Sequence, residues 1–214
     1  IARNPRAGTA DQLRFRQAGS LMNAGDYEAA INAYEQYIRT TNNERRVAEA
    51  RYEIAEAYRQ SGNTQAAIQA YRFVADEFPN RPQASRALLE LGTLYMQQQA
   101  YEEALSAYGE LSQLQTDRSL SFQAFIGMSE AALALNRPRE ATEQLNRAAG
   151  LPGKSAQEED RLSLGRANVA LQQGNYDDAT DIFRRLADGN SGETGARAQL
   201  GLGRSLQQQG RHLD

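Results

Sequence analysis

The sequence predicts an all-α protein, a right-handed superhelical solenoid of stacked antiparallel helix hairpins. Three observations predict this fold class. A short phrase recurs along the chain, a turn signal stands at the same place in each copy, and two columns of side chains, one small and one large, keep a fixed distance from the phrase. A single hairpin cannot bury its apolar face alone, whereas stacked hairpins share a continuous core. Residues 11–214 are therefore expected to form one solenoid.

The recurring phrase ends in an alanine, and the positions of these alanines give the length of the repeat. The phrase reads MQQQAYEEA at 96–104 and LQQGNYDDA at 171–179, and four further copies align with it. Successive marker alanines lie about 37 positions apart, which predicts five complete repeats and a truncated sixth. The marker alanines are Ala30, Ala67, Ala104, Ala141 and Ala179. The predicted repeats are 11–47, 48–84, 85–121, 122–159, 160–195 and, truncated, 196–214.

Each repeat is expected to hold two helices with a short turn between them. The first helix should begin about 19 residues before the marker alanine, with apolar side chains at helical spacing such as Leu88, Leu91 and Tyr95. In four copies the turn contains a glycine, which suits the left-handed end of a helix. These glycines are Gly25, Gly62, Gly174 and Gly210.

The second helix is expected to begin directly after this turn. Asp26, Asn63 and Asn175 stand where an N-cap residue belongs, and acids such as Glu102 gather in the first turn, where the helix dipole favours them. Pro138 of the fourth repeat is tolerated in a first helical turn.

The remaining length is expected to lie between repeats, in RTTNNERR, DEFPNRPQ, QLQTDRSL and LPGKSAQEED. Residues 1–10 are expected to be a linker or the tail of a preceding repeat. Residues 196–210 are expected to form the first helix of the sixth repeat. That helix is either a cap docked on the fifth repeat or, as we favour, the continuation of a longer protein.

Two columns explain how the hairpins interlock. A small residue twelve positions before each marker alanine lets the two helices of one hairpin approach closely, and a large residue four positions after it fills the space towards the next repeat. The small residues are Ala18, Ala55, Gly92, Ser129 and Ala167, and the large ones are Tyr34, Tyr71, Tyr108, Leu145 and Phe183.

This alternation resembles the tetratricopeptide repeat (TPR), and the resemblance covers nearly the whole chain. The third repeat matches the family pattern at Leu88, Leu91-Gly92, Tyr95, Tyr101, Ala104 and Tyr108, and the second matches it at Ile54-Ala55, Tyr58, Gly62, Ala67, Tyr71 and Pro79. The repeats are about three residues longer than the usual 34. The fifth repeat departs from the pattern, with Arg166 where leucine is expected and Leu164-Gly165 two residues early.

The longer period and the phrase ADEFPNRPQASRALLELGTLY are similar to repeats of bacterial envelope proteins. Examples are the assembly lipoproteins of the outer membrane and the periplasmic coordinators associated with Tol proteins. This similarity favours the bacterial periplasm or envelope over the cytoplasm.

Composition argues against several classes of function. The net charge of −3 gives no basic face for nucleic acid, the chain has no cysteine, and no apolar run approaches the roughly 20 residues of a membrane span. The only histidine, His212, has no second group beside it for general-base or metal chemistry. The glycines Gly201 and Gly203 are interpreted as helix-packing positions. We therefore expect a non-enzymatic protein without cofactor or metal.

A partner is expected to bind where the first helices of such a solenoid line a concave surface. Apolar residues dominate the floor of this predicted groove, so it suits an extended peptide or an amphipathic helix of another protein. Acids on its walls, including Glu49, favour a basic or neutral segment, and Arg161, Arg197 and Arg204 face the C-terminal end. The predicted partner-binding residues are Phe15, Met22, Tyr52, Glu53, Glu56, Leu89, Glu90, Met96, Ile126, Glu130, Leu133, Leu164 and Leu171.

Other interpretations stay open at this point. The apolar floor residues could simply pack between adjacent first helices. The chain could be a structural or oligomerisation module that stacks through its ends, because Leu200, Leu202 and Leu206 would lack a partner within a truncated repeat. RNA binding by helical-hairpin repeats is a third interpretation, against which the acidic groove argues.

The TPR resemblance also allows one known function of the family, chaperone binding, to be compared with this sequence. Chaperone-binding members hold a C-terminal carboxylate with lysine and asparagine on adjoining first helices. The corresponding positions here carry Phe15, Gly19, Tyr52, Glu53 and Glu56. No binding to the acidic tail of a chaperone is therefore expected.

Overall fold

The computed structural model describes residues 5–189 and 192–211. Within these residues it contains eleven α-helices and no strand, which confirms the all-α class. The chain forms two compact units, a first unit up to Leu94 and a second unit from Tyr95. The boundary falls inside one helix, α5 (Pro82–Gln97).

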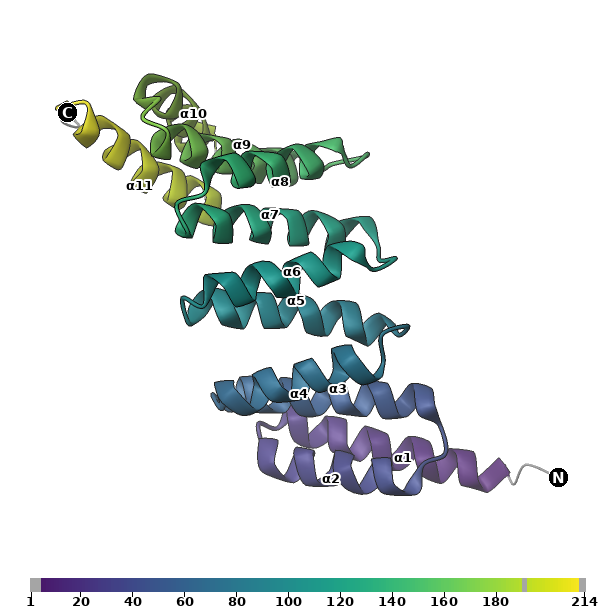
Figure 1. Ribbon diagram of the computed structural model, residues 1–214. Coiled ribbons are helices and arrows are strands. Elements are labelled where there is room, and N and C mark those ends of the chain that lie inside the picture. The colour runs from purple at the N-terminus through teal and green to yellow at the C-terminus, as the bar shows by residue number, and fades with distance from the viewer. Residues whose placement is uncertain (1–4, 190–191, 212–214) are drawn as a thin grey trace. The chain divides into compact units, whose positions relative to one another are not determined.

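In the first unit each of the first three helices packs on the next one in sequence (Figure 1). The core joins Ala18, Tyr34, Tyr37, Ala50 and Ile54, so it is shared by the first hairpin and the first helix of the second. The helices of this unit are α1 (Pro5–Asn23), α2 (Tyr27–Thr40), α3 (Glu44–Gln60), α4 (Thr64–Glu77) and all but the last residues of α5 (Pro82–Gln97).

The second unit repeats the same plan: from α6 to α11 each helix packs on the next, and α9 also contacts α7 and α11. Consecutive hairpins therefore pack on one another, as the sequence predicts. The helices are α6 (Tyr101–Gln113), α7 (Arg118–Ala134), α8 (Pro138–Gly150), α9 (Ala156–Gln172), α10 (Tyr176–Gly189) and α11 (Glu193–Gln208).

The first helices begin earlier than the sequence analysis expects. Asn43, Asp117 and Ser155 act as N-caps, each accepting a hydrogen bond from a backbone N–H three residues on. Glu158 completes a capping box with Ser155. The residues expected between repeats thus partly lengthen α3, α7 and α9. Residues 5–10 likewise belong to α1, and the division of the chain into repeats stays a prediction.

The turns inside the hairpins follow the expected chemistry. Gly25, Gly62, Gly174 and Gly210 all have positive φ, and Asp26 and Asn63 accept hydrogen bonds from the backbone N–H groups of Ala29 and Ala66. Pro138 is in the first turn of α8. In the two hairpins without a turn glycine, Gln99 and Asn136 adopt the left-handed conformation instead, with φ of 60° and 59°. The N-cap role of Asn175 stays a prediction.

The two columns form the core. All five marker alanines, all five small residues and all five large residues are buried. A further small position lies on the first helix of the following repeat, facing the large residue: a Cβ added to Gly127 would lie 2.5 Å from the Tyr108 ring. The same holds for Gly165 against Leu145 and for Gly201 against Phe183. Gly201 is therefore a helix-packing position, as expected.

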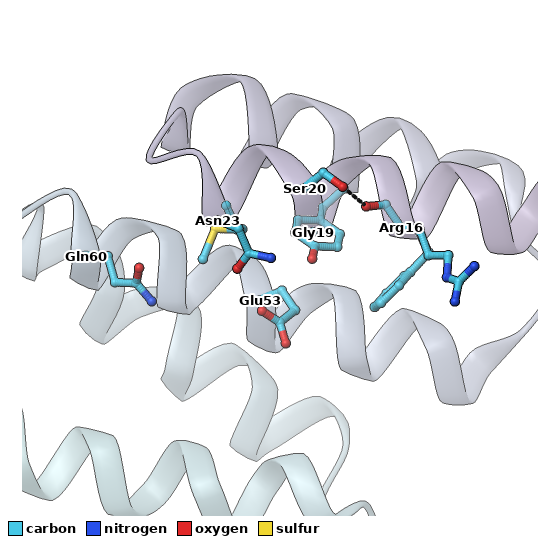
Figure 2. A pocket seen from close by; sticks show the side chains of 9 residues that line it. Arg16, Gly19, Ser20, Asn23, Glu53 and Gln60 are labelled. Atoms are coloured by element: carbon cyan, nitrogen blue, oxygen red, sulfur yellow. Dashed lines mark hydrogen bonds between the residues drawn. The ribbon is translucent and has the colours of Figure 1, made fainter.

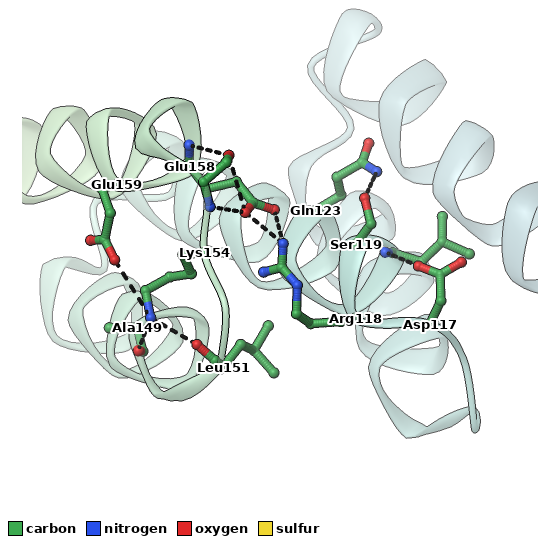
Figure 3. A network of polar contacts seen from close by, with 11 residues as sticks. Asp117, Arg118, Ser119, Gln123, Ala149, Leu151, Lys154, Glu158 and Glu159 are labelled. Carbon is green, nitrogen blue, oxygen red and sulfur yellow. Dashed lines mark hydrogen bonds and ion pairs between the residues drawn. The ribbon is translucent and has the colours of Figure 1, made fainter.

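A polar network ties three helix ends together in the second unit (Figure 3). Arg118 at the start of α7 donates to both carboxylate oxygens of Glu158 at the start of α9, at 2.6 and 2.5 Å. Lys154 donates to the carbonyl oxygens of Ala149 and Leu151, each at 2.7 Å, at the end of α8. The network fixes the loop between α8 and α9 and so the register of two successive repeats.

Helix α11 docks on α9 and α10. The buried hydroxyl groups of Ser205 and Thr180 lie 2.6 Å apart, and Ser205 donates to the Tyr176 carbonyl oxygen at 2.8 Å. Leu206 is buried, and half-buried Leu202 packs against the core that α11 shares with α9 and α10, so the preceding repeat covers these two leucines of the truncated repeat. Leu200 is exposed, as expected.

Candidate partner-binding surface

In the first unit the predicted groove residues lie on first helices, as expected. None of them belongs to the fully buried core, and each keeps part of its surface accessible. Phe15 and Met22 pack from α1 against the core of the unit. The set comprises Phe15 and Met22 on α1, Tyr52, Glu53 and Glu56 on α3, and Leu89 and Glu90 on α5.

A cavity of about 550 Å³ opens between α1 and α3 (Figure 2). Its walls come from α1 and α3, with Tyr34 of α2 behind them. Figure 2 shows the Glu53 carboxylate in the middle of the cavity wall, with the amides of Asn23 and Gln60 on one side of it. The cavity is lined by Phe15, Arg16, Gly19, Ser20, Met22, Asn23, Tyr34, Glu53 and Gln60. Six of these are not among the predicted groove residues: Arg16, Gly19, Ser20, Asn23, Tyr34 and Gln60.

Glu53 is the unpaired acid of this region. Among the residues that the structure describes, no hydrogen bond and no ion pair reaches its carboxylate. Burial raises the pKa of Glu53, and the charges of Glu56 and Glu49 raise it further, while Arg86 lowers it. Burial and the charges of Glu53 and Glu49 also raise the pKa of the Tyr34 hydroxyl. The Glu53 carboxyl group is therefore half-buried at the cavity in surroundings that disfavour its charged form.

The neighbouring acids are neutralised. The Arg59 guanidinium lies 2.6 Å from Glu56 and 3.8 Å from Glu90, and the Tyr71 hydroxyl donates to Glu56. Burial alone would raise the pKa of Glu56, but the hydrogen bonds from Arg59 and Tyr71 outweigh burial and lower it. Glu49 is held by Arg46 at 2.9 Å. The acidic wall expected from the sequence is thus reduced to Glu53.

The corresponding surface of the second unit is filled. Ile126 and Leu164 are only 3% and 4% exposed, so these two predicted groove residues are core residues. Glu130 of α7 pairs with Arg197 of α11 at 2.7 Å. The cavity beneath this pair measures about 10 Å³, room for a single water at most. Glu130, predicted for the acidic centre, and Arg197, predicted for the basic C-terminal end, therefore neutralise each other.

The remaining predicted groove residues of the second unit are half-buried. Leu133 and Leu171 pack against the cores of their hairpins, which agrees with the alternative that floor residues serve packing. Met96, at the end of α5, is half-buried as well.

Two further features bear on function. Over residues 5–189 and 192–211, no group of three acidic or histidine side chains could hold a metal ion. In the same described part of the chain, no helix combines the length and apolarity that crossing a membrane would need. His212 lies outside the described residues.

Comparison with known proteins identifies the repeat. The family model described as tetratricopeptide repeat matches residues 15–82, 55–117, 126–194 and 164–214. The chain belongs to the tetratricopeptide repeat family. The TPR fold supports a protein–protein interaction scaffold, and members of the family are typically non-enzymatic.

Solved TPR structures have the same fold at low sequence identity. A TPR protein from Parabacteroides merdae has a TM-score of 0.77 and 17% identity over 95% of this chain and 75% of its own. The apo form of RapI has a TM-score of 0.75 and 18% identity over 92% of this chain and 60% of its own. Pseudomonas aeruginosa pilF has a TM-score of 0.65 and 18% identity over 94% of this chain and 84% of its own. No curated protein matches the chain. The partner therefore has to be inferred from the surface of this TPR chain itself.

Proposed function

We propose that this TPR chain is a non-enzymatic scaffold that binds a peptide or helix of a partner protein on its first helices, mainly in the first unit. The observation that carries the proposal is the contrast between the two units. The first-unit surface opens into a cavity of about 550 Å³, whereas the matching surface of the second unit is closed by core side chains and an ion pair. A bound segment needs concave, accessible surface with a few polar groups.

The test is affinity capture with the intact protein, followed by competition with surface variants. Leu89→Glu places a carboxylate among the half-buried side chains of α5 and is expected to abolish capture of the partner. Gln69→Glu adds the same charge to an exposed position of the second helix α4 and is the matched control. Equal capture by both variants would place the partner elsewhere on the molecule.

The second unit provides a further comparison. Leu133→Glu on α7 is expected to weaken capture far less than Leu89→Glu, because its surroundings are already filled. Asn146→Glu on the exposed face of α8 is its control.

A structural role through self-association is the second candidate, and one exposed side chain favours it. Leu200 on α11 leaves 58% of its surface exposed. In light scattering, a dimer that forms with rising concentration and is lost in Leu200→Glu would support this role. The bacterial envelope stays the proposed location, on the resemblance of the repeat sequences alone.

A further inference from the structure

We infer that the first-unit cavity holds a basic side chain of the bound segment, an arginine or a lysine, with Glu53 as its counter-ion. The inference rests on the proposed function, because it specifies what a partner places in the cavity. Two features of the cavity lower the stability of the folded chain, and both are explained by such an occupant.

The first feature is the charge of Glu53. Its neighbours Glu49 and Glu56 have arginine partners at 2.9 and 2.6 Å, but no basic group of the described residues comes within ion-pair distance of Glu53. Leaving a half-buried carboxylate without a hydrogen bond is unfavourable. A cation that enters the cavity would remove that penalty.

The arginines near the cavity are committed elsewhere. Arg46 pairs with Glu49 and stacks over the Phe15 ring at 4.8 Å, and Arg59 bridges Glu56 and Glu90. Arg16 lines the rim, but Figure 2 shows its guanidinium directed away from the Glu53 carboxylate. The charge of Arg86 lowers the pKa of Glu53, but Arg86 makes no ion pair with it, so within the described residues the chain does not fill the site with a cation of its own.

The second feature is Gly19, in the interior of α1, where glycine is a poor helix former. A Cβ added there would meet the Tyr34 hydroxyl at 3.5 Å, an ordinary contact, so packing does not require glycine. Gly127, Gly165 and Gly201 differ, because a neighbouring side chain leaves no room for a Cβ. At Gly19 the missing side chain adds open space to the cavity.

The chemistry of the walls selects the occupant. An acidic side chain would meet Glu53 as a like charge, and a purely apolar one would bury the Glu53 charge unpaired. A lysine or arginine supplies the opposite charge, and its aliphatic stem can cover Met22 and the exposed edge of Phe15. The cavity volume of about 550 Å³ is ample for one such side chain with adjoining backbone.

The experiment compares fluorescent peptide mixtures that are random except at a fixed central residue. The fixed residue is arginine, lysine or citrulline, the neutral analogue of arginine, and binding to the intact protein is measured by anisotropy. We expect the arginine or lysine mixture to bind about tenfold more tightly than the citrulline mixture. Glu53→Gln is expected to remove this preference. Glu35→Gln, which changes the net charge equally on exposed α2, is expected to keep it.

Gly19→Ala gives an independent test of the cavity. It is expected to weaken binding of the basic mixtures about tenfold while the protein remains folded, because a methyl group enters the cavity. Gly109→Ala on α6 is the matched control, since its Cβ would meet only Met128 at 4.0 Å, and it should leave binding unchanged.

Two results would overturn the inference. In the first, the citrulline and basic mixtures bind equally well, and Leu89→Glu abolishes the binding of both. The scaffold function then stands, but the cavity has no preference for a cation. The other is absence of binding by any mixture to wild-type protein, after which capture of the partner still decides the scaffold function separately.

Discussion

Gln99 holds a left-handed backbone conformation that most hairpins of this chain give to glycine. Its φ is 60°, where a side chain costs roughly 1–2 kcal/mol that glycine avoids. Since glycine loses more chain entropy on folding, Gln99→Gly should stabilise the protein by about 0.5–1 kcal/mol. Urea unfolding measures the change. The converse change, Gly62→Ala, should destabilise by a similar amount, and no neighbour within 4 Å complicates it. A loss of stability in Gln99→Gly would contradict this account.

Glu53 makes stability depend on pH in the direction opposite to a paired acid. Its folded-state pKa is raised, so the folded chain prefers the protonated form. The penalty is absent below the unfolded pKa of about 4.3 and is fully present above the folded pKa. Glu53→Gln should therefore raise the unfolding midpoint at about pH 7, with a gain that shrinks as the pH falls towards about 4. Glu35→Gln controls for the change in net charge. If Glu53→Gln raised the unfolding midpoint equally at every pH, the raised pKa of Glu53 would not be the cause.

At the scale of helices, the contact between α6 and α7 depends on Gly127. A Cβ there would lie 2.5–2.9 Å from three atoms of the buried Tyr108 ring, which cannot move without disturbing the core. Gly127→Ala should therefore cost about 1–3 kcal/mol of unfolding free energy. Gly109→Ala, also within a helix but with space around it, should stabilise by up to about 1 kcal/mol. Denaturant unfolding compares the free energies of unfolding of the two variants. Equal changes in both would show that overpacking against Tyr108 is not the cause.

The helices could be predicted from the sequence because their signals are local. Glycine, aspartate and asparagine mark the turns, and the alanine, small and large columns mark the buried face. The expected helix starts fall too late because they rest on the repeat spacing, whereas the helices begin at the local caps Asn43, Asp117 and Ser155. Ser155 with Glu158 forms a recognisable capping box. The second small position at Gly127, Gly165 and Gly201 could also have been found by its spacing.

At the scale of the whole molecule, the binding surface was less predictable than the fold. Periodicity gives the face of a helix on which a residue lies, but not whether neighbours fill the space above it. Ile126 and Glu53 occupy neighbouring positions of the same pattern, yet one is core and the other lines a cavity. Which arginine pairs with which acid depends on side-chain reach across helices, as Glu130 and Arg197, 67 positions apart, demonstrate.

The sequential packing of the helices predicts that damage stays local. From α1 to α4 and from α6 to α11 each helix contacts the next in sequence, so within each unit stability is approximately a sum of repeat terms and nearest-neighbour terms. Gly201→Ala brings a Cβ to 2.4 Å from the Phe183 ring and should open α10 and α11. Gly127→Ala should instead act on α6 and α7. By hydrogen exchange with mass spectrometry, each variant should accelerate exchange in its own helices and leave α1–α3 protected as in wild type. Equal acceleration in α1–α3 would mean that the chain opens as a single cooperative body.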